Sequence, residues 1–382
     1  MTFEQKLNGV KTHLSEGDID LGFRKLIDCV LDTERADFYK TCIGIVAWQE
    51  NNADNSTEYI LKINKLIGEL SQLEITATPL EGPLIEAKAL GKTYGANKFS
   101  LGPVDLQINA GDIWGLVGEN GNGKTTLLRI LAHEIIYNSG TLSFHPEIQE
   151  ASNYKLRTKL VYISQRTPKW YGSLKDNLKF TAAHHGHKGE MNELIVEMYI
   201  IRFGLWAFRN HKWSELSSGY KMRFELARTF LRSPKILLLD EPLANLDVMA
   251  QQMILEDLKH IAQSIANPIG IILSSQQLFE VEKISNKVLY LKHGKPTFLH
   301  DIENENSQWQ TVLEIDMKSD RKTIELALSS LGEIQIHFNG GVYHIYSKHA
   351  KYFPQIVGQL MAHGIEITYV RDISVSTRRL FL

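Results

Sequence analysis

The sequence contains little cysteine, little net charge and no long apolar run. Only two of its 382 residues are cysteines, Cys29 and Cys42, which cannot form a disulfide framework and are compatible with a reducing compartment. We expect both to be small buried apolar side chains. The formal net charge of −2 provides no overall basic field, so no nucleic-acid partner is expected. No segment reaches the roughly 18 apolar residues of a membrane-spanning helix, and the first residues lack the apolar stretch of a signal peptide.

These absences restrict where the chain can act. We expect a cytoplasmic protein, and if it works at a membrane, another chain must supply the spanning part. At 382 residues the chain is too long for one compact core, so two or three domains are expected.

The most informative stretch is Gly118-Glu119-Asn120-Gly121-Asn122-Gly123-Lys124-Thr125-Thr126, which fits the pattern G-x-x-x-x-G-K-[ST]. An apolar segment typical of a buried strand precedes it, and a segment with helical apolar spacing follows. A strand, a glycine-rich turn and a helix start together surround a phosphate with backbone N–H groups and a positive helix end. We therefore expect Lys124 to contact the β- and γ-phosphates of a nucleotide and Thr125 to bind Mg²⁺. The alternative, a chance glycine-rich turn, is disfavoured by the context on both sides.

Two adjacent carboxylates follow the apolar strand predicted at 235–239. A strand of a parallel sheet buries both of its faces, so Asp240 and Glu241 are not expected to be ordinary surface residues. Asp240 is suited to the Mg²⁺ shell, and Glu241 is suited to polarise the attacking water. The alternative is a pair of acids that cap the next helix.

Residues 1–78 are expected to form a helical domain. Phe3, Leu7 and Val10 recur at the spacing of one helix face, and similar stripes follow. The first 75 residues contain thirteen Asp or Glu against eight Lys or Arg, which we interpret as a solvated acidic face. A linker is expected around Thr76–Pro83.

The rest of the chain predicts two further domains. Residues 79–305 alternate short strands with helices, which predicts an α/β domain whose mostly parallel sheet holds ligands at the carboxyl ends of its strands, with a helical subdomain at about 168–232. Residues 306–382 follow the order strand, helix, two strands, helix, strand, with a hairpin turn at Asn339-Gly340-Gly341. This order is typical of a ferredoxin-like α+β unit. A short helix capped at Asp372 is expected to end the chain.

The motifs together resemble those of ABC-type ATPases. Leu216-Ser217-Ser218-Gly219-Tyr220-Lys221 resembles the signature motif, and Leu246-Asp247 resembles the D-loop. With the phosphate loop and Asp240, they occur in the family's order within residues 84–300. The resemblance implies a P-loop NTPase fold of ABC type, with ATP and Mg²⁺ as cofactors. It further implies that Tyr94, in a loop predicted at 91–95, stacks on adenine and that Gln165 senses the γ-phosphate and Mg²⁺.

Ser217, Ser218 and Gly219 begin a helix, where a hydroxyl and bare backbone form a second anion site. The resemblance implies that this site, with Asp247, closes on ATP held by another chain, so that a homodimer or a pair of ATPase subunits encloses two ATP molecules. A plain helix N-cap is the alternative. The family usually has glycine and glutamine where Ser218 and Tyr220 stand. Ser218 is tolerable near phosphates, whereas Tyr220 is bulkier.

Gln276 occupies the position at which the resemblance implies a switch histidine. Its amide can donate a hydrogen bond to a phosphate but cannot carry a proton or a positive charge. Our hypothesis is that Glu241 maintains hydrolysis and that Gln276 slows it, while Gln165 completes the catalytic set.

Two clusters have open interpretations. Trp170 and Tyr171 are predicted to be exposed, and the resemblance implies contact with a transmembrane partner, whereas packing in the helical subdomain is equally compatible. His184, His185 and His187 are compatible with a metal site. A solvated loop is preferred, because no acid or cysteine accompanies these histidines.

The resemblance implies an ATP-hydrolysing subunit of an ABC transporter, located on the cytoplasmic face of the inner membrane, with integral membrane permease chains as partners. The segments 171–180 and 371–381 resemble ATPases of bacterial exporters, which favours export. A soluble ATPase that remodels a ribosome, DNA or an assembly complex is one alternative. A slowly hydrolysing ATP-gated scaffold, indicated by Gln276, is another.

Overall fold

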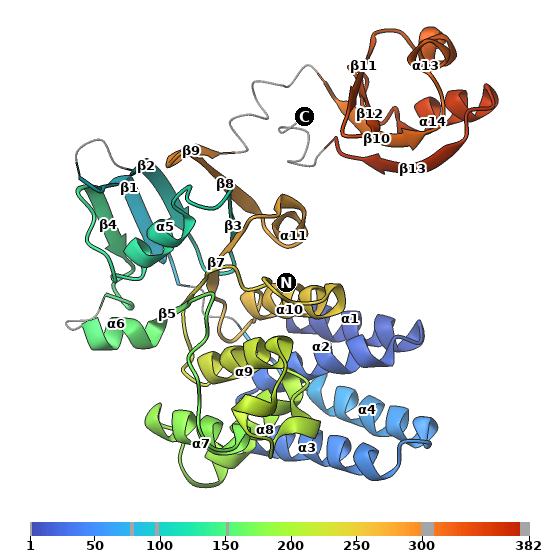
Figure 1. Ribbon diagram of the computed structural model, residues 1–382. Coiled ribbons are helices and arrows are strands. Elements are labelled where there is room, and N and C mark those ends of the chain that lie inside the picture. Colours follow the sequence, from blue (N-terminus) through green and yellow to red (C-terminus); the bar gives the residue numbers. More distant parts are fainter. Residues whose placement is uncertain (1, 77–79, 96–98, 150–152, 299–308, 375–382) are drawn as a thin grey trace.

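The computed structural model describes residues 2–76, 80–95, 99–149, 153–298 and 309–374 (Figure 1). The domain boundaries expected near residues 78 and 305 lie outside the described residues, as does most of the terminal helix expected after Asp372. Within the described residues, no helix combines the length and the apolar character needed to cross a membrane.

The chain begins with four helices, α1 (Phe3–Ser15), α2 (Ile19–Asp32), α3 (Ala36–Asn51) and α4 (Ser56–Leu70). The predicted stripe of α1 is confirmed, because Phe3, Leu7 and Val10 are all buried. Cys29 and Cys42 are buried free thiols, as expected, and burial raises the pKa of each to about 12. Both thiols are therefore protonated and unreactive at neutral pH.

A six-stranded sheet forms the centre of the next section, in the order β5-β6-β7-β3-β8-β9. Its strands are β3 (Ile113–Val117), β5 (Leu160–Ile163), β6 (Ile236–Leu239), β7 (Gly270–Ser275), β8 (Lys287–Lys292) and β9 (Lys295–Phe298). The first five are parallel and only β9 is antiparallel, so the predicted mostly parallel sheet is confirmed. Alternate residues of β6 belong to different hydrophobic clusters. Leu237 and Leu239 belong to one cluster, and Ile236 and Leu238 belong to the other. The sheet therefore has a core on each face.

A smaller antiparallel sheet accompanies the first, in the order β2-β1-β4: β1 (Ile85–Thr93), β2 (Ser100–Ile108) and β4 (Ser139–Phe144). The loop expected from Gly91 is wrong in part, because residues 91–93 belong to β1. A Cβ at Gly91 would lie 2.5 Å from Ser139 Oγ, so glycine here permits the close approach of β4 rather than a turn. Helix α5 (Lys124–Leu131) packs its buried leucines against both sheets.

Helices α7 (Leu174–His184), α8 (Gly189–Arg202) and α9 (Ser218–Phe230) form the predicted helix-rich section, with short 3-10 turns η1 (Trp206–Phe208) and η2 (Trp213–Glu215). The remaining helices of this part are α6 (Asn153–Lys159), α10 (Val248–Ala262) and α11 (Leu278–Glu282). Helix α10 contacts β7 of the central sheet as well as α9. Figure 1 shows the four N-terminal helices beside α8, α9 and α10.

The last section is a four-stranded antiparallel sheet in the order β11-β12-β10-β13. Its elements are β10 (Thr311–Met317), α13 (Arg321–Leu328), η3 (Ser329–Leu331), β11 (Ile334–Asn339), β12 (Val342–Ser347), α14 (Phe353–Ala362) and β13 (Ile367–Asp372). Gly340 and Gly341 both have positive φ, as the tight turn of the predicted hairpin requires. The ferredoxin-like prediction is confirmed, and this section has a hydrophobic cluster of its own.

Candidate nucleotide-binding site

Two glycines of the phosphate loop occupy places that a larger residue would strain. Gly118 has a φ of 156°, and a Cβ there would lie 2.5 Å from Leu291 O. Gly123 has a φ of 101°, and its Cβ would lie 2.8 Å from Phe99 Cζ. Gly123 also caps α5, so the positive end of that helix faces the loop.

The Lys124 side chain is only 5% exposed and is held by three oxygen atoms. Its Nζ donates to Gly118 O at 2.6 Å and to Glu119 O at 3.3 Å, and it lies 3.1 Å from Glu241 Oε1. The two carbonyl groups fix the position of the ammonium group beside the loop. An incoming phosphate would therefore compete with Glu241 for a cation that is already in place.

Asp240 lies at the end of β6, is 4% exposed and accepts hydrogen bonds from three hydroxyl groups. These are Thr125 Oγ1 at 2.8 Å, Ser274 Oγ at 2.8 Å and Tyr162 OH at 3.2 Å. Burial and the carboxylate of Asp240 raise the pKa of Tyr162, so the phenol stays protonated and able to donate. Thr125 and Asp240 thus place hydroxyl and carboxylate oxygens together, the hard ligands that Mg²⁺ prefers.

Glu241 and Gln276 meet in front of Lys124. Gln276 Nε2 donates to Glu241 Oε2 at 3.3 Å, while the other carboxylate oxygen faces Lys124. Glu241 has a φ of 50°, in the left-handed region, and its N–H donates to Ser274 Oγ at 2.9 Å. Ser274 therefore holds the carboxylate of Asp240 and the backbone of Glu241, a role that no sequence pattern indicates.

A cavity of about 280 Å³ lies between these residues. Ten of the residues predicted for the site line it: Glu119, Asn120, Gly121, Gly123, Lys124, Thr125, Thr126, Gln165, Glu241 and Gln276. Phe99 also lines it and was not predicted. Phe99 follows the predicted aromatic loop by only a few residues, but an aromatic side chain at the start of a strand is too common to single out.

Four predicted residues of this half of the site lie outside the cavity lining: Tyr94, Gly118, Asn122 and the buried Asp240. Asn122 is buried, and its Oδ1 accepts from His293 N at 2.9 Å, so the side chain fixes the loop to the turn after β8. Tyr94 is 38% exposed, with Lys92 Nζ 5.3 Å from its ring centroid. The adenine-stacking role of Tyr94 remains a prediction.

The predicted signature residues lie on the same chain but do not line the cavity. Ser217 caps α9, Asp247 caps α10, and Ser218 Oγ donates to Asn245 O at 3.1 Å. At Gly219 a Cβ would lie 3.4 Å from the Cβ of Ala250 in α10. The starts of α9 and α10 are therefore packed together, away from the phosphate loop of their own chain.

Tyr220 is bulkier than the glutamine usual at this position of the family. The centroid of its ring lies 4.2 Å from that of the Phe208 ring. The guanidinium of Arg223 lies 5.3 Å from the centroid of the Tyr220 ring. Tyr220 is thus accommodated by packing with η1.

The prediction that Trp170 is exposed is wrong. Trp170 Nε1 donates to Glu225 Oε1 at 2.6 Å, Arg228 lies 4.6 Å from its ring centroid, and the ring packs against the main core. Tyr171, by contrast, is 89% exposed. The reason is that Glu225 is buried on α9, where Arg228 donates to its Oε2 and the indole N–H satisfies its Oε1.

The histidine cluster makes ring contacts. The His184 ring stacks on Phe180 with 6.4 Å between centroids and lies 5.2 Å from the His185 ring. Across the described part of the chain, no three His, Cys, Asp or Glu side chains come together as metal ligands.

Comparisons with known proteins identify the family. The family model described as ABC transporter matches residues 101–244, which include the phosphate loop, the signature residues and Asp240. An uncharacterized ABC transporter ATP-binding protein of Methanocaldococcus jannaschii is 30% identical over 225 residues, covering 58% of this chain and 79% of that protein. The ABC transporter ATP-binding protein YtrB of Bacillus subtilis is 28% identical over 229 residues, which are 58% of this chain and 73% of YtrB.

Other relatives differ in length and in the direction of transport that their names state. A Rickettsia felis protein named as an export ATP-binding/permease protein is 32% identical over 213 residues, and the chain covers only 37% of its length. The methionine import ATP-binding protein MetN 2 of Listeria monocytogenes is 31% identical over 204 residues, with 52% of this chain and 59% of MetN 2 covered. Names of both kinds therefore occur among the relatives.

Two solved structures share the fold. CbiO1 of Clostridium perfringens, part of the ABC transporter complex CbiONQ, aligns with a TM-score of 0.53 at 21% identity, over 66% of this chain and 98% of CbiO1. An ATP-binding subunit of an ABC transporter aligns with a TM-score of 0.50 at 25% identity, over 59% of this chain and 93% of that subunit. With the geometry of the phosphate loop, these matches confirm the resemblance: the chain belongs to the family of ABC transporter ATP-binding proteins and contains its ATPase domain.

Proposed function

We propose that the chain is the ATP-hydrolysing subunit of an ABC transporter, which pairs with a second ATP-binding subunit through ATP and drives permease chains in the inner membrane. The observation that carries this proposal is the separation of the two half-sites. The cavity contains Lys124, Gln165, Glu241 and Gln276, whereas Ser217 and its neighbours lie outside it. A nucleotide bound at Lys124 therefore lacks the second anion site unless another chain supplies it.

The chain's own residues have separate tasks in this reaction. Backbone N–H groups of the loop and the start of α5 bind the phosphates, and Lys124 moves from Glu241 to the γ-phosphate because the phosphate carries more negative charge. Glu241 is then free to accept a proton from the attacking water. Thr125, Gln165 and Asp240 would hold Mg²⁺, which neutralises charge that develops on the phosphate oxygens.

Gln276 is expected to tune the rate. Its amide reaches Glu241 Oε2 at 3.3 Å, so it can orient the carboxylate and donate to a phosphate oxygen. Because the amide of Gln276 cannot supply a positive charge to the phosphate, we expect slow ATP hydrolysis. Because of Gln276, an ATP-gated scaffold that hydrolyses slowly is the second candidate function. Steady-state phosphate release separates the two, since a motor turns over many ATP molecules and a scaffold retains them.

The transport role rests on family membership and on exposed Tyr171, which follows Gln165 in the segment after β5. A side chain 89% exposed to solvent is suited to contact with a partner. We propose export as the direction, on the likeness of residues 171–180 to exporter ATPases. The place of action would be the cytoplasmic face of the inner membrane. Copurification from detergent-solubilised membranes tests this, and recovery without any integral membrane protein favours a soluble remodelling ATPase instead.

The test of the proposed function uses Glu241→Gln. This variant removes the general base and keeps the shape of the side chain, so ATP and Mg²⁺ should convert the monomer to a stable dimer that retains nucleotide. ADP with the same variant, and ATP with Lys124→Ala, should leave the monomer unchanged. Size-exclusion chromatography with light scattering measures both. A Glu241→Gln protein that stays monomeric at saturating ATP would refute the proposal.

A further inference from the structure

Helix α2 carries three charged side chains at a spacing of four residues, which places Arg24, Asp28 and Asp32 on one helix face. Arg24 Nη2 donates to Asp257 Oδ1 on α10. Asp32 accepts from Ser264 Oγ at 2.6 Å, in the loop after α10. The N-terminal helices are thus bonded to the helix that covers the central sheet.

Asp28 of the same face bonds to the helical subdomain instead. It accepts from Arg202 Nε and, at 3.1 Å, from Arg202 Nη2, at the end of α8. Arg202 Nη1 also donates to Asp257 Oδ1 on α10. The Arg202 side chain is 1% exposed and that of Arg24 is 23% exposed, so two arginines and two aspartates form a largely buried network that joins α2, α8 and α10.

The charge state of Arg202 follows from these partners. Burial alone would lower the pKa of Arg202, but the carboxylates of Asp28 and Asp257 outweigh burial and raise the pKa. The guanidinium therefore stays charged at all accessible pH values, and removal of one carboxylate leaves a buried charge only partly compensated.

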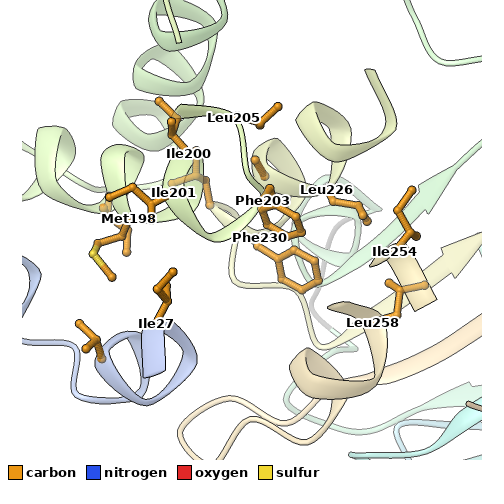
Figure 2. Close-up of a cluster of buried hydrophobic side chains, with 14 of the residues drawn as sticks. Ile27, Met198, Ile200, Ile201, Phe203, Leu205, Leu226, Phe230, Ile254 and Leu258 are labelled. Atoms are coloured by element: carbon orange, nitrogen blue, oxygen red, sulfur yellow. The ribbon is translucent and has the colours of Figure 1, made fainter. Parts of the chain in front are cut away.

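The same three helices share a hydrophobic core. Figure 2 shows Ile27 of α2 facing Met198 and Ile201 of α8, with Ile254 and Leu258 of α10 on the other side of Phe230. All of them belong to one continuous cluster that extends from the first helix of the chain to the central sheet. The N-terminal helices therefore do not pack around a core of their own.

Packing is incomplete beside the ion network. A cavity of about 250 Å³ lies there, lined by Asp28, Tyr199, Arg202 and His260 among others. Because apolar side chains do not fill this part of the interface, the ion pairs provide the directional connection between α2, α8 and α10.

We propose that the N-terminal helices act as a clamp that holds the helical subdomain (α7–α9) and the sheet with α10 as one rigid body, with Arg202 as the positioning residue. The consequence concerns the second anion site. Ser217 begins α9 and Asp247 begins α10, so the clamp fixes both relative to the phosphate loop. Rigid-body rotation of the helical subdomain is thereby restricted before nucleotide binds.

The test measures the distance between spin labels on the two parts. Ala183→Cys on α7 and Ile136→Cys after α5 place labels at exposed positions, and the buried native thiols Cys29 and Cys42 do not react. The clamped protein should give one narrow distance that stays unchanged with ATP and Mg²⁺. Asp28→Asn should broaden the distribution or add a second distance. A broad distribution before mutation, a shift with ATP, or an unchanged width in Asp28→Asn would overturn the proposal.

Matched controls separate the clamp from a general loss of stability. Asp20→Asn removes the same charge from an exposed position of the same helix and should leave the distance distribution unchanged. If Asp28→Asn does not fold, Arg24→Gln, whose side chain is 23% exposed, takes its place. A merely structural role would lower the melting temperature without a change in the distance distribution of the folded protein.

The effect on nucleotide rests on the proposed function, whereas the distance measurement does not. In a Glu241→Gln background, Asp28→Asn should raise the ATP concentration for half-maximal dimerisation by about tenfold, equivalent to about 1.4 kcal/mol, because ATP must then order the subdomain itself. If no protein dimerises at all, the proposed function fails and the distances still decide the clamp. If the distances broaden while dimerisation is unchanged, the clamp does not serve the nucleotide site and that part of the inference is wrong.

Discussion

At the scale of single residues, the nucleotide-binding site depends on a backbone conformation at Glu241 that glutamate does not favour. Glu241 adopts a φ of 50° although it has a Cβ, and such residues cost roughly 1–3 kcal/mol where surrounding contacts hold them. The hydrogen bond from its N–H to Ser274 Oγ is one such contact. Ser274 Oγ also donates to Asp240, so a single hydroxyl positions both acids.

Replacement of this hydroxyl should impair catalysis more than folding. Ser274→Ala leaves a buried N–H and a carboxylate oxygen without that partner, which costs about 1–3 kcal/mol of stability. Because Glu241 is then free to move, the kcat for ATP hydrolysis should fall by about tenfold or more. Ser347→Ala is the matched control, since Ser347 is equally buried in the C-terminal sheet. A Ser274→Ala enzyme as active as the control would contradict the positioning role.

A second prediction at this scale concerns Gln276. An imidazole can carry the positive charge that the amide lacks, so Gln276→His should raise the kcat for ATP hydrolysis by about tenfold or more. Glu241→Gln should nearly abolish hydrolysis in both backgrounds. Steady-state phosphate release at saturating ATP measures all four proteins. An unchanged rate in Gln276→His together with an active Glu241→Gln would refute the division of roles between them.

At the scale of elements, the sequence predicts what local patterns determine. The phosphate loop is recognisable because Gly118 and Gly123 are required by the backbone itself, and α1 is recognisable by its apolar spacing. The contributions of Ser274 and Tyr162 depend on which strands lie beside β6, and that order is set by long-range pairing. Trp170 was misjudged for a similar reason, because its partner Glu225 lies on a helix distant in sequence.

Helix α10 also makes stability depend on pH through His260. Burial, together with the nearby charges of Arg202 and Lys25, lowers the pKa of His260 to about 3, although Asp257 opposes this shift. In the unfolded chain the pKa is about 6.5, so between these values only the unfolded state binds the proton. The free energy of unfolding should therefore fall as pH drops below about 6.5, by up to about 1.4 kcal/mol per pH unit.

Urea unfolding at several pH values from about 7.5 to about 5 measures this dependence. Most Asp and Glu side chains stay ionised in this interval, so they contribute little to the change. His260→Gln removes the titrating group and should show a shallower fall over the same interval. His363→Gln, at an exposed helix end, is the control and should follow the parent protein. If the free energy of unfolding falls equally with pH in His260→Gln and in the parent protein, the pKa of His260 is the same in the folded and unfolded states and the prediction is wrong.

At the scale of the whole molecule, the domain division read from the sequence differs from the distribution of cores. Apolar stripes on α1 to α4 show that each helix buries one face, but not what covers that face. In the structure these helices share one cluster with α8, α9, α10 and the central sheet. The C-terminal sheet has a separate cluster, and its Arg371 Nη2 lies 4.0 Å from Glu282 Oε2, an ion pair of a kind that contributes about 0–1 kcal/mol.

This distribution predicts two unfolding transitions in the full chain. The larger should contain the N-terminal helices together with the nucleotide site, and the smaller should contain the C-terminal sheet. ATP with Mg²⁺ at about 100 times its Kd adds about 2.7 kcal/mol to the unit that binds it. In Glu241→Gln, calorimetry should therefore show the larger transition rising by several degrees while the smaller one stays in place. Lys124→Ala should lose the shift. A label at exposed Leu61 reports the unfolding of the N-terminal helices. If these helices unfold in a separate transition, they form an independent domain, and the shared core does not make their unfolding cooperative with that of the nucleotide site.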